Sequence, residues 1–530
     1  MQIIPSVLFL VAFFLFCLHH KRVEQSEKLQ RLVCAMTGFA SALLALLILD
    51  NWNGWGGDFS QYIAQARAIV THTIESQVQN NLFIINHSPP FTADPVYPWG
   101  FPLMLAPFYV LFGENLFALK IPVVLCFFCS TILSNRLFRK HFSFFQAELL
   151  TLFISVNPVF IFFCNSPLSD IPFLCLSLAA LLSIERLFSV ADKKKQTFAG
   201  VSAGICTFLA FMTRSNGIVF PCLLFSLHIL MLANKKERVG RFLSKRGFSG
   251  FADPFFPAHV CAYAIFFAAV LIQHSLLPQA GSTHMTYLKY ISISSIAKNI
   301  VYYIRLAPTF FPFGQTFPLS LASTSAAAML LPFLWYGLVR FMPKNPILFL
   351  YVLGSASILI LWPTQQGIRF LFPIIPPLIV FTALGTGAAF QKHKNPPLHR
   401  IAVALEILAV IACIAIYALR ASLPKSDDGP YSSDAKAMYS FIMEETPENA
   451  KIMFFKPRVL YLKTGRLGFR GTDISQSTTA DYLLLSREDS TFDFNIEQSN
   501  PEQFKKLRLV FENNRFKLYK VLDIPVSEKR

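Results

Sequence analysis

The sequence predicts an α-helical polytopic membrane protein with about 12 spans and a small C-terminal extracytoplasmic α/β domain. Hydrophobic residues make up 54% of the 530 residues and charged residues only 15%, with a mean hydropathy of +0.48. Because a soluble chain carries about 25% charged residues, this composition excludes a soluble multidomain protein. Two further observations agree with it: basic residues cluster between apolar runs, and the composition changes abruptly near residue 425.

Apolar segments that could span a membrane recur along the first 419 residues. They lie near residues 3–18, 32–49, 115–135, 146–163, 170–189, 198–213, 217–233, 259–277, 322–340, 346–362, 371–389 and 400–419. Several are shorter than the ~20 residues that a helical span prefers, so their ends are approximate. The first run has neither a basic segment before it nor a small-residue cleavage site after it, which favours a retained signal anchor over a cleaved signal peptide.

The distribution of charge predicts the topology. The net charge is +17, and residues 1–419 hold 29 Lys and Arg against 14 Asp and Glu. The short basic clusters between apolar runs follow the positive-inside rule, so we expect no nucleic-acid partner. With every cluster on the cytoplasmic side, segment 50–114 and all residues after 420 lie outside. We therefore expect a multi-pass protein of the inner (cytoplasmic) membrane whose C-terminal domain is extracytoplasmic.

This topology divides the chain into four parts. Residues 1–49 hold the N-terminal spans, 50–114 form a first outer loop with surface helices, 115–419 form a membrane core, and 425–530 form a soluble α/β domain. In the last part, helical periodicity over 433–446 predicts a helix with Ser433 or Asp434 as its N-cap. Short runs typical of strands lie at 451–455, 481–485, 507–511 and 516–521.

Acidic residues are scarce before residue 420, so the position of Asp58 in the first outer loop is informative. It follows Trp55-Gly56-Gly57 and precedes a helical pattern that runs through Val70. A carboxylate there can cap the helix by accepting backbone N–H groups, which is the simpler interpretation on spacing alone.

Asp170 and two arginines mark the outer ends of later apolar spans. Asp170 opens a span within Leu168-Ser169-Asp170-Ile171-Pro172, where a helix N-cap is again the simplest role. Arg214 and Arg369 lie at predicted outer ends of spans, whereas the basic clusters lie on the predicted cytoplasmic side. Each could snorkel to the interface, or bind a phosphate through its forked guanidinium.

A second set of basic residues lies in an aromatic-rich outer loop. Lys289 and Arg305 occur there together with His284. They could bind a lipid phosphate or anchor an amphipathic helix at the headgroups. The chain has no Asp-x-Asp motif and no P-loop, which argues against metal-bound nucleotide-sugar chemistry and ATP-driven transport.

Taken in order, these elements resemble the GT-C class of membrane glycosyltransferases, and most closely the branch of bacterial protein O-mannosyltransferases and lipid A aminoarabinose transferases. The matching elements are Asp58 opening a surface helix, Tyr97-Pro98-Trp99-Gly100-Phe101-Pro102-Leu103, Leu168 to Pro172, a glycine-rich helix from Ala199-Gly200 to Arg214, Arg369 to Pro373, and the terminal Asn513 to Tyr519. Many family members carry two adjacent acids in the first loop, whereas Phe59 follows Asp58 here. Asp58 then acts alone or with Asp170 or Asp94.

The resemblance implies a GT-C-like fold and a glycosyltransferase that takes a sugar from a polyprenyl-phosphate donor at the outer face, without a nucleotide. It implies Asp58 as base, Asp170 as a second catalytic candidate and Arg369 as the first phosphate ligand, with Arg214, Lys289 and Arg305 behind it. Candidates to line the substrate pocket are Gln61, Tyr62, Asp94, Tyr97 and His284. The expected partners are the lipid-linked donor, membrane lipids and an envelope glycan, lipid or protein acceptor. Some GT-C enzymes use a divalent metal and others do not, so this cofactor stays open.

Two other classes of protein remain as alternatives. A lipid-glycan transporter or flippase predicts broken helices in paired halves and no outer carboxylate. An O-antigen polymerase or ligase would rely on a large outer loop between late spans, whereas the largest soluble piece here is C-terminal.

Overall fold

The chain folds into two compact units in this computed structural model. Unit 1 comprises Met1–Leu49, Lys120–Leu276 and His284–Leu423, and unit 2 comprises Asp50–Leu119, Leu277–Thr283 and Pro424–Arg530. The structure describes residue 12 and residues 16–89, 94–234, 255–278, 288–310, 319–391, 396–423 and 427–522.

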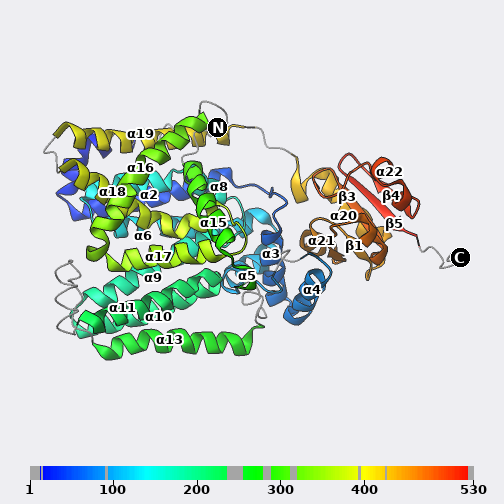
Figure 1. Cartoon of the computed structure of the whole chain (residues 1–530), viewed down its shortest axis with the longest axis horizontal. Coiled ribbons are helices and arrows are strands. Elements are labelled where there is room, and N and C mark those ends of the chain that lie inside the picture. The colour runs from blue at the N-terminus through cyan, green and yellow to red at the C-terminus, as the bar shows by residue number, and fades with distance from the viewer. Residues whose placement is uncertain are drawn as a thin grey trace. The chain divides into compact units, whose positions relative to one another are not determined.

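Unit 1 is built from helices (Figure 1). These are α2 (Glu27–Ile48), α6 (Leu116–Phe138), α7 (Phe144–Ser155), α8 (Pro158–Phe163), α9 (Asp170–Ser189), α10 (Lys193–Thr213), α11 (Val219–Asn234), α13 (Phe256–Leu276), α15 (Ile293–Leu306), α16 (Leu319–Phe341), α17 (Pro346–Leu361), α18 (Ile375–Gln391) and α19 (Pro396–Ala421). Across the described ranges, nine helices are long and apolar enough to cross a membrane. The predicted helical membrane fold is confirmed.

Two of the predicted spans do not appear as single helices among the described residues. The run predicted at 146–163 is divided into α7 and α8, because Asn157 caps the second helix through the backbone N–H of Val159 and Pro158 starts it. The run near residues 3–18 lies for the most part outside the described residues.

Two glycines of α10 bring this helix close to α13. A Cβ atom at Gly200 would collide with the carbonyl group of Ala258, and one at Gly204 would lie 2.7 Å from the carbonyl oxygen of Ala262. Helix α10 also packs along α9, so these three helices lie side by side (Figure 1). The glycine-rich pattern of α10 thus sets the close packing of the helix that ends at Arg214.

Unit 2 combines Asp50–Leu119, which contains the predicted first outer loop and is called the first outer segment here, with the C-terminal sheet. Its helices are α3 (Gly57–Val70), α4 (Ile74–Asn86), α5 (Gly100–Phe112), α20 (Ser433–Glu445), α21 (Pro457–Thr464), α22 (Ile496–Ser499) and α23 (Pro501–Phe504), and its strands are β1 (Lys451–Met453), β2 (Leu467–Phe469), β3 (Tyr482–Ser486), β4 (Leu507–Glu512) and β5 (Phe516–Val521). The strand order is β2-β1-β3-β5-β4, parallel from β2 to β3 and antiparallel beyond.

The tail differs from the prediction at two points. Strand β2 was not predicted, because Leu467-Gly468-Phe469 is too short to show an alternating pattern. The predicted N-cap of α20 was wrong by one residue, since the side chain of Ser432 accepts from the backbone N–H of Ala435. The predicted small α/β domain is otherwise confirmed by the five-stranded sheet.

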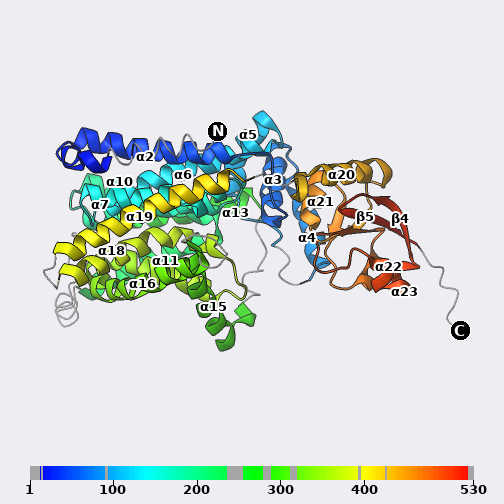
Figure 2. The same cartoon turned by 90° about the horizontal axis from the view of Figure 1, so that it is seen from above.

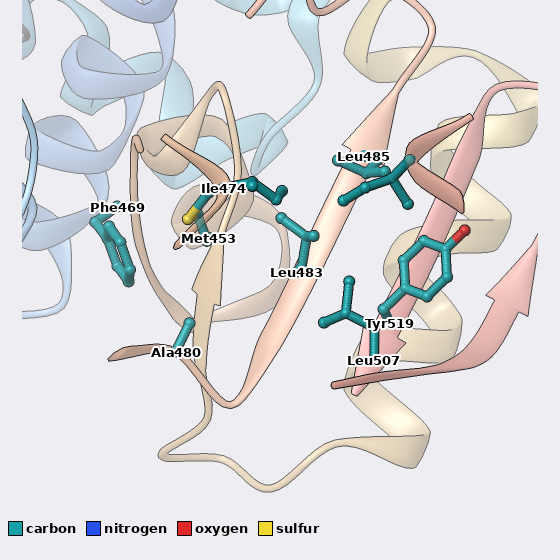
Figure 3. Packing of buried hydrophobic residues seen from close by; sticks show 9 residues of the cluster. Met453, Phe469, Ile474, Ala480, Leu483, Leu485, Leu507 and Tyr519 are labelled. Atoms are coloured by element: carbon teal, nitrogen blue, oxygen red, sulfur yellow. The ribbon is translucent and has the colours of Figure 1, made fainter. Parts of the chain in front are cut away.

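A hydrophobic core supports the sheet (Figure 3). It gathers side chains from all five strands and from the connecting segments between them, which include α22. Its members are Met453, Phe469, Ile474, Ala480, Leu483, Leu485, Ile496, Leu507 and Tyr519, all buried. Burial of these side chains from water is the main favourable term for the module.

Side-chain contacts join the first outer segment to the tail within unit 2. The indole N–H of Trp52 donates to Asp428 at 2.8–2.9 Å, Lys463 pairs with Glu114, and Arg67 donates to the carbonyl of Leu462 at 3.2 Å. Helix α21 packs against α3 and α4, as Figure 2 shows. These contacts make the first outer segment and the tail parts of one compact unit.

Candidate active site

Asp58 lies in the first turn of α3. The N-cap of this helix is Gly56, so Asp58 is the second helical residue and not the cap. An acidic side chain in a first helical turn is stabilised by the helix dipole. The half-buried carboxylate also has a tertiary partner, because its Oδ1 accepts a hydrogen bond from the Tyr97 hydroxyl at 2.8 Å.

Tyr97 is fixed in its loop by a glutamine of α3. The Gln65 side chain donates to the Tyr97 carbonyl and accepts from the Tyr97 N–H, both at 2.9 Å. The Tyr97 ring packs on Tyr62, with ring centroids 5.1 Å apart. Burial, and then the negative charge of Asp58, raises the pKa of Tyr97 well above its usual range. Tyr97 therefore keeps its proton and acts as a donor to Asp58.

Two cations from the tail complete this cluster. Arg458 of α21 donates from Nη1 to the Tyr97 hydroxyl at 2.9 Å, and its guanidinium lies 4.9 Å from the centroid of the same ring. The Lys456 ammonium interacts electrostatically with Asp58, while burial and then Arg470 lower the pKa of Lys456. The sequence analysis did not predict either cation.

One sequence signal could have pointed to Lys456 and Arg458. They flank Pro457 at the N-terminus of α21. Positive charge is unfavourable at a helix N-terminus, so two basic residues there require a compensating partner elsewhere. For Lys456 this partner is Asp58, which lies about 400 residues earlier in the sequence, and only the tertiary fold identifies it.

The remaining pocket candidates of this unit have different positions. Gln61 is buried and donates to Gln65 at 2.9 Å, and the Tyr62 ring also packs edge-on against Phe101. The Asp94 carbonyl accepts from the second guanidinium nitrogen of Arg458. His284 lies outside the described residues.

A second polar cluster lies in unit 1, where three predicted site residues meet. Arg214 donates to Asp170 Oδ1 at 2.5 Å and to the Ser169 hydroxyl at 3.3 Å, and Nη1 of Arg369 lies 3.8 Å from Asp170 Oδ2. Both guanidinium groups lie over the Phe370 ring. The distance from Cζ to the ring centroid is 4.1 Å for Arg214 and 5.3 Å for Arg369.

Burial distinguishes the members of this cluster. The Asp170 side chain is 2% exposed, against 12% for Arg214 and 25% for Arg369. Asp170 is the first helical residue of α9, and Ser169 is the N-cap, so Asp170 does not cap the helix as its simplest role predicted. Two cations and one carboxylate give these three side chains together a net positive charge, which suits an anion.

Lys289 and Arg305 have different surroundings. Both are exposed side chains in unit 1. Lys289 lies 5.2 Å from the centroid of the Tyr290 ring, and Arg305 lies in the last turn of α15. Among the described residues, neither forms an ion pair with Asp170.

A metal site was left open by the sequence. Within the part of the chain that the structure describes, no three His, Cys, Asp or Glu side chains are grouped so that they could hold a metal ion.

Part of the chain matches a known protein family, and most of it has a fold similar to those of solved structures. Residues 95–249 match the family model described as dolichyl-phosphate-mannose-protein mannosyltransferase. No curated protein matches the chain. Among solved structures, ArnT from Cupriavidus metallidurans bound to undecaprenyl phosphate has a TM-score of 0.55 at 13% identity, over 91% of this chain and 97% of that one. The apo state of ArnT gives the same values.

A second solved structure has a similar fold. It is the archaeal oligosaccharyltransferase AglB from Archaeoglobus fulgidus, in complex with an inhibitory peptide and a dolichol-phosphate. Its TM-score is 0.50 at 14% identity, over 86% of this chain and 69% of that one. The expected resemblance to GT-C class membrane glycosyltransferases is confirmed by the family match and by this shared fold. The matched segment contains Tyr97, Asp170 and Arg214, and it excludes Asp58 and Arg369.

Proposed function

We propose that this chain is a glycosyltransferase that moves a sugar from a polyprenyl-phosphate donor to an acceptor hydroxyl at the outer face of the cytoplasmic membrane. The observation that carries the proposal is the pair of arginines, Arg214 and Arg369, held around the buried carboxylate of Asp170 in unit 1. Transfer of a lipid-linked sugar also fits the family match and the lipid phosphates named for ArnT and AglB.

The arginine pair suits the phosphate of a membrane lipid. Arg214 follows the C-terminal end of α10 and Arg369 precedes α18, so both lie at ends of apolar helices. A lipid whose tail packs along such helices presents its phosphate at their ends. Forked guanidinium donors match phosphate oxygens, and fixed positive charge stabilises the negative charge that a leaving phosphate gains.

Asp58 supplies the base. In the transfer, the acceptor oxygen forms a bond to the anomeric carbon of the sugar, and the bond from that carbon to the phosphate oxygen breaks. The bonding electron pair leaves with the polyprenyl phosphate, and the Asp58 carboxylate takes the proton of the acceptor hydroxyl. A half-buried aspartate fixed by a tyrosine hydroxyl is suited to this role.

Asp170 has a positioning role in this proposal. Its Oδ1 is occupied by Arg214, and the side chain is buried. We therefore assign it to holding the arginines, with Asp58 as the sole base.

The acceptor and the orientation in the membrane follow from the proposed topology. Unit 2 joins three segments that the positive-inside rule places outside, and it contains Asp58. The acceptor is then an envelope glycan, lipid or protein that reaches this face. A transporter would also need the arginine pair, but it would not need a fixed carboxylate base.

Mass spectrometry of cellular lipids tests the proposal. Cells that lack the protein should accumulate a polyprenyl-phosphate sugar and should lack one sugar unit on an envelope acceptor. The missing mass identifies the sugar class. A transporter predicts a different result, in which a complete lipid-linked glycan accumulates and every sugar unit is present on it.

A further inference from the structure

We propose that Arg458, acting through Tyr97, is a positioning residue for the Asp58 base, so that the C-terminal module is part of the catalytic machinery. This inference rests on the proposed function, because it assigns Asp58 as the base. It adds a residue from α21 that belongs to none of the motifs of the first outer loop.

The hydrogen bonds from Arg458 to Asp58 have a fixed direction. A guanidinium can only donate, so the Tyr97 oxygen must accept from Nη1 of Arg458 at 2.9 Å. The single hydroxyl proton of Tyr97 is then directed at Asp58 Oδ1, 2.8 Å away. An ionised carboxylate can only accept, so Tyr97 donates to Asp58, and Arg458 holds in place the hydroxyl that orients the carboxylate.

Each member of this hydrogen-bonded chain is held by other contacts. Gln65 fixes the backbone of Tyr97 on both its N–H and its carbonyl. Arg458 is 7% exposed, stacks on the Tyr97 ring and donates to the Asp94 carbonyl. Rigid support of this kind keeps a catalytic group within the narrow geometry that transfer requires.

Local stability does not explain why an arginine occupies position 458. Its Nε is buried and has no hydrogen-bond partner among the described residues, which is a cost to folding. It also lies in the first turn of α21, where a positive charge is disfavoured. The contact with Tyr97 and, beyond it, the negative charge of Asp58 offset the unfavourable positive charge at this helix start.

Charged side chains also act along this chain of hydrogen bonds. The charged and titratable groups that act on Tyr97 are Asp58, Arg458 and Tyr62, and Lys456 acts on Asp58 as well. The positive charge of Arg458 favours an ionised carboxylate at its far end. Loss of that charge should therefore make the base easier to protonate.

Three variants of the full-length protein test the proposal. They are Tyr97→Phe, which keeps the ring and removes only the hydroxyl, Arg458→Gln and the conservative Arg458→Lys. Arg466→Gln is the matched control, because Arg466 is 8% exposed in the same module and bonds to Thr446 and backbone carbonyls instead. The assay uses purified protein and the polyprenyl-phosphate sugar isolated from cells that lack the protein.

We expect Tyr97→Phe and Arg458→Gln each to lower kcat by roughly 10- to 100-fold with a small change in donor KM. Arg458→Gln should move the acid limb of the pH–rate profile up by roughly one pH unit, and Arg458→Lys should restore its position. The double variant should be no slower than the slower single variant, because both changes break the same chain.

The outcomes separate this inference from the proposed function. If Asp58→Asn is inactive but Tyr97→Phe has normal kcat and an unchanged pH profile, the positioning role is wrong and the base assignment stands. If Asp58→Asn is active, the proposed function itself fails. If Arg466→Gln lowers kcat and thermal stability as much as Arg458→Gln does, and the pH profile of Arg458→Gln is unchanged, Arg458 is only structural.

Discussion

Nη1 of Arg369 lies 3.8 Å from Oδ2 of Asp170, whereas Oδ1 of the same carboxylate accepts a short hydrogen bond from Arg214. Oδ2 is buried and accepts no hydrogen bond among the described residues. The two arginines are therefore held unequally by one carboxylate. Under the proposed function this arrangement fixes Arg214 and keeps Arg369 close to it, so that both can share a phosphate.

Asp170→Asn should damage donor binding and leave the pH dependence unchanged. The amide keeps the shape of the side chain but loses the charge that holds the two arginines. We expect donor KM to rise about tenfold and the protein to lose about 1–3 kcal/mol of stability. Steady-state kinetics and thermal unfolding in detergent check both effects. A shift of the acid limb of the pH–rate profile would instead identify Asp170 as a base.

Although Arg369 is partly exposed, its substitution should lower kcat/KM strongly. Arg369→Lys keeps the positive charge but removes the paired N–H donors of the guanidinium, so kcat/KM should fall about tenfold. Arg369→Gln removes the charge and should cost about 100- to 1,000-fold. Arg340→Gln is the control, since Arg340 is an exposed arginine near the end of α16. Equal losses for Arg369→Gln and Arg340→Gln would mean that Arg369 has no phosphate-binding role.

The close packing of α10 against α13 should not tolerate a side chain at Gly200. The Cβ atom of Gly200→Val would meet the Ala258 carbonyl, so the helices must separate and Arg214 must move with α10. We expect severe loss of folded protein, by about 3 kcal/mol or more. Gly387→Ala is the control, because nothing lies within 4 Å of a Cβ atom there. Size-exclusion chromatography and thermal unfolding measure the difference.

The ion pair between Lys463 and Glu114 should stabilise unit 2 as a whole. Lys463 also lies over the Tyr431 ring at 3.8 Å, and the paired side chains are 18% and 24% exposed. Lys463→Met should cost about 1–3 kcal/mol, because it leaves a largely buried carboxylate without its cation.

Hydrogen exchange checks this effect on unit 2. Protection should fall in both α3 and α21 after Lys463→Met, since the two helices pack together. Lys505→Met is the control, because Lys505 forms an exposed pair with Glu502. A loss of hydrogen-exchange protection confined to the tail would mean that the first outer segment and the tail are independently stable.

The sequence predicted the helices and the candidate site residues of this protein better than it predicted which residues contact one another. Long apolar runs and basic clusters predicted the membrane helices because both signals are local. Asp58, Asp170, Arg214 and Arg369 were candidates because charged residues are rare near membrane spans. The split between α7 and α8 was missed because the runs on both sides of Pro158 are apolar.

The pairing of the site residues could not be predicted, because it depends on contacts distant in the chain. Asp170 meets Arg214 and Arg369 only when α9, the end of α10 and the segment just before α18 converge. Arg458 reaches Tyr97 from 361 residues away. On spacing alone a helix cap was the simplest role for both aspartates, whereas the structure gives each of them a tertiary partner in addition to a first-turn position.

The most direct test of the central claim is Asp58→Asn in cells that lack the chromosomal copy, read by mass spectrometry of lipids and envelope glycans. Glu75→Gln is the matched control, since Glu75 is an exposed first-turn acid of the neighbouring helix α4. The account predicts that wild type and Glu75→Gln restore the missing sugar unit, while stably produced Asp58→Asn leaves the polyprenyl-phosphate sugar accumulated. Full restoration by Asp58→Asn would contradict the account and would favour a transporter.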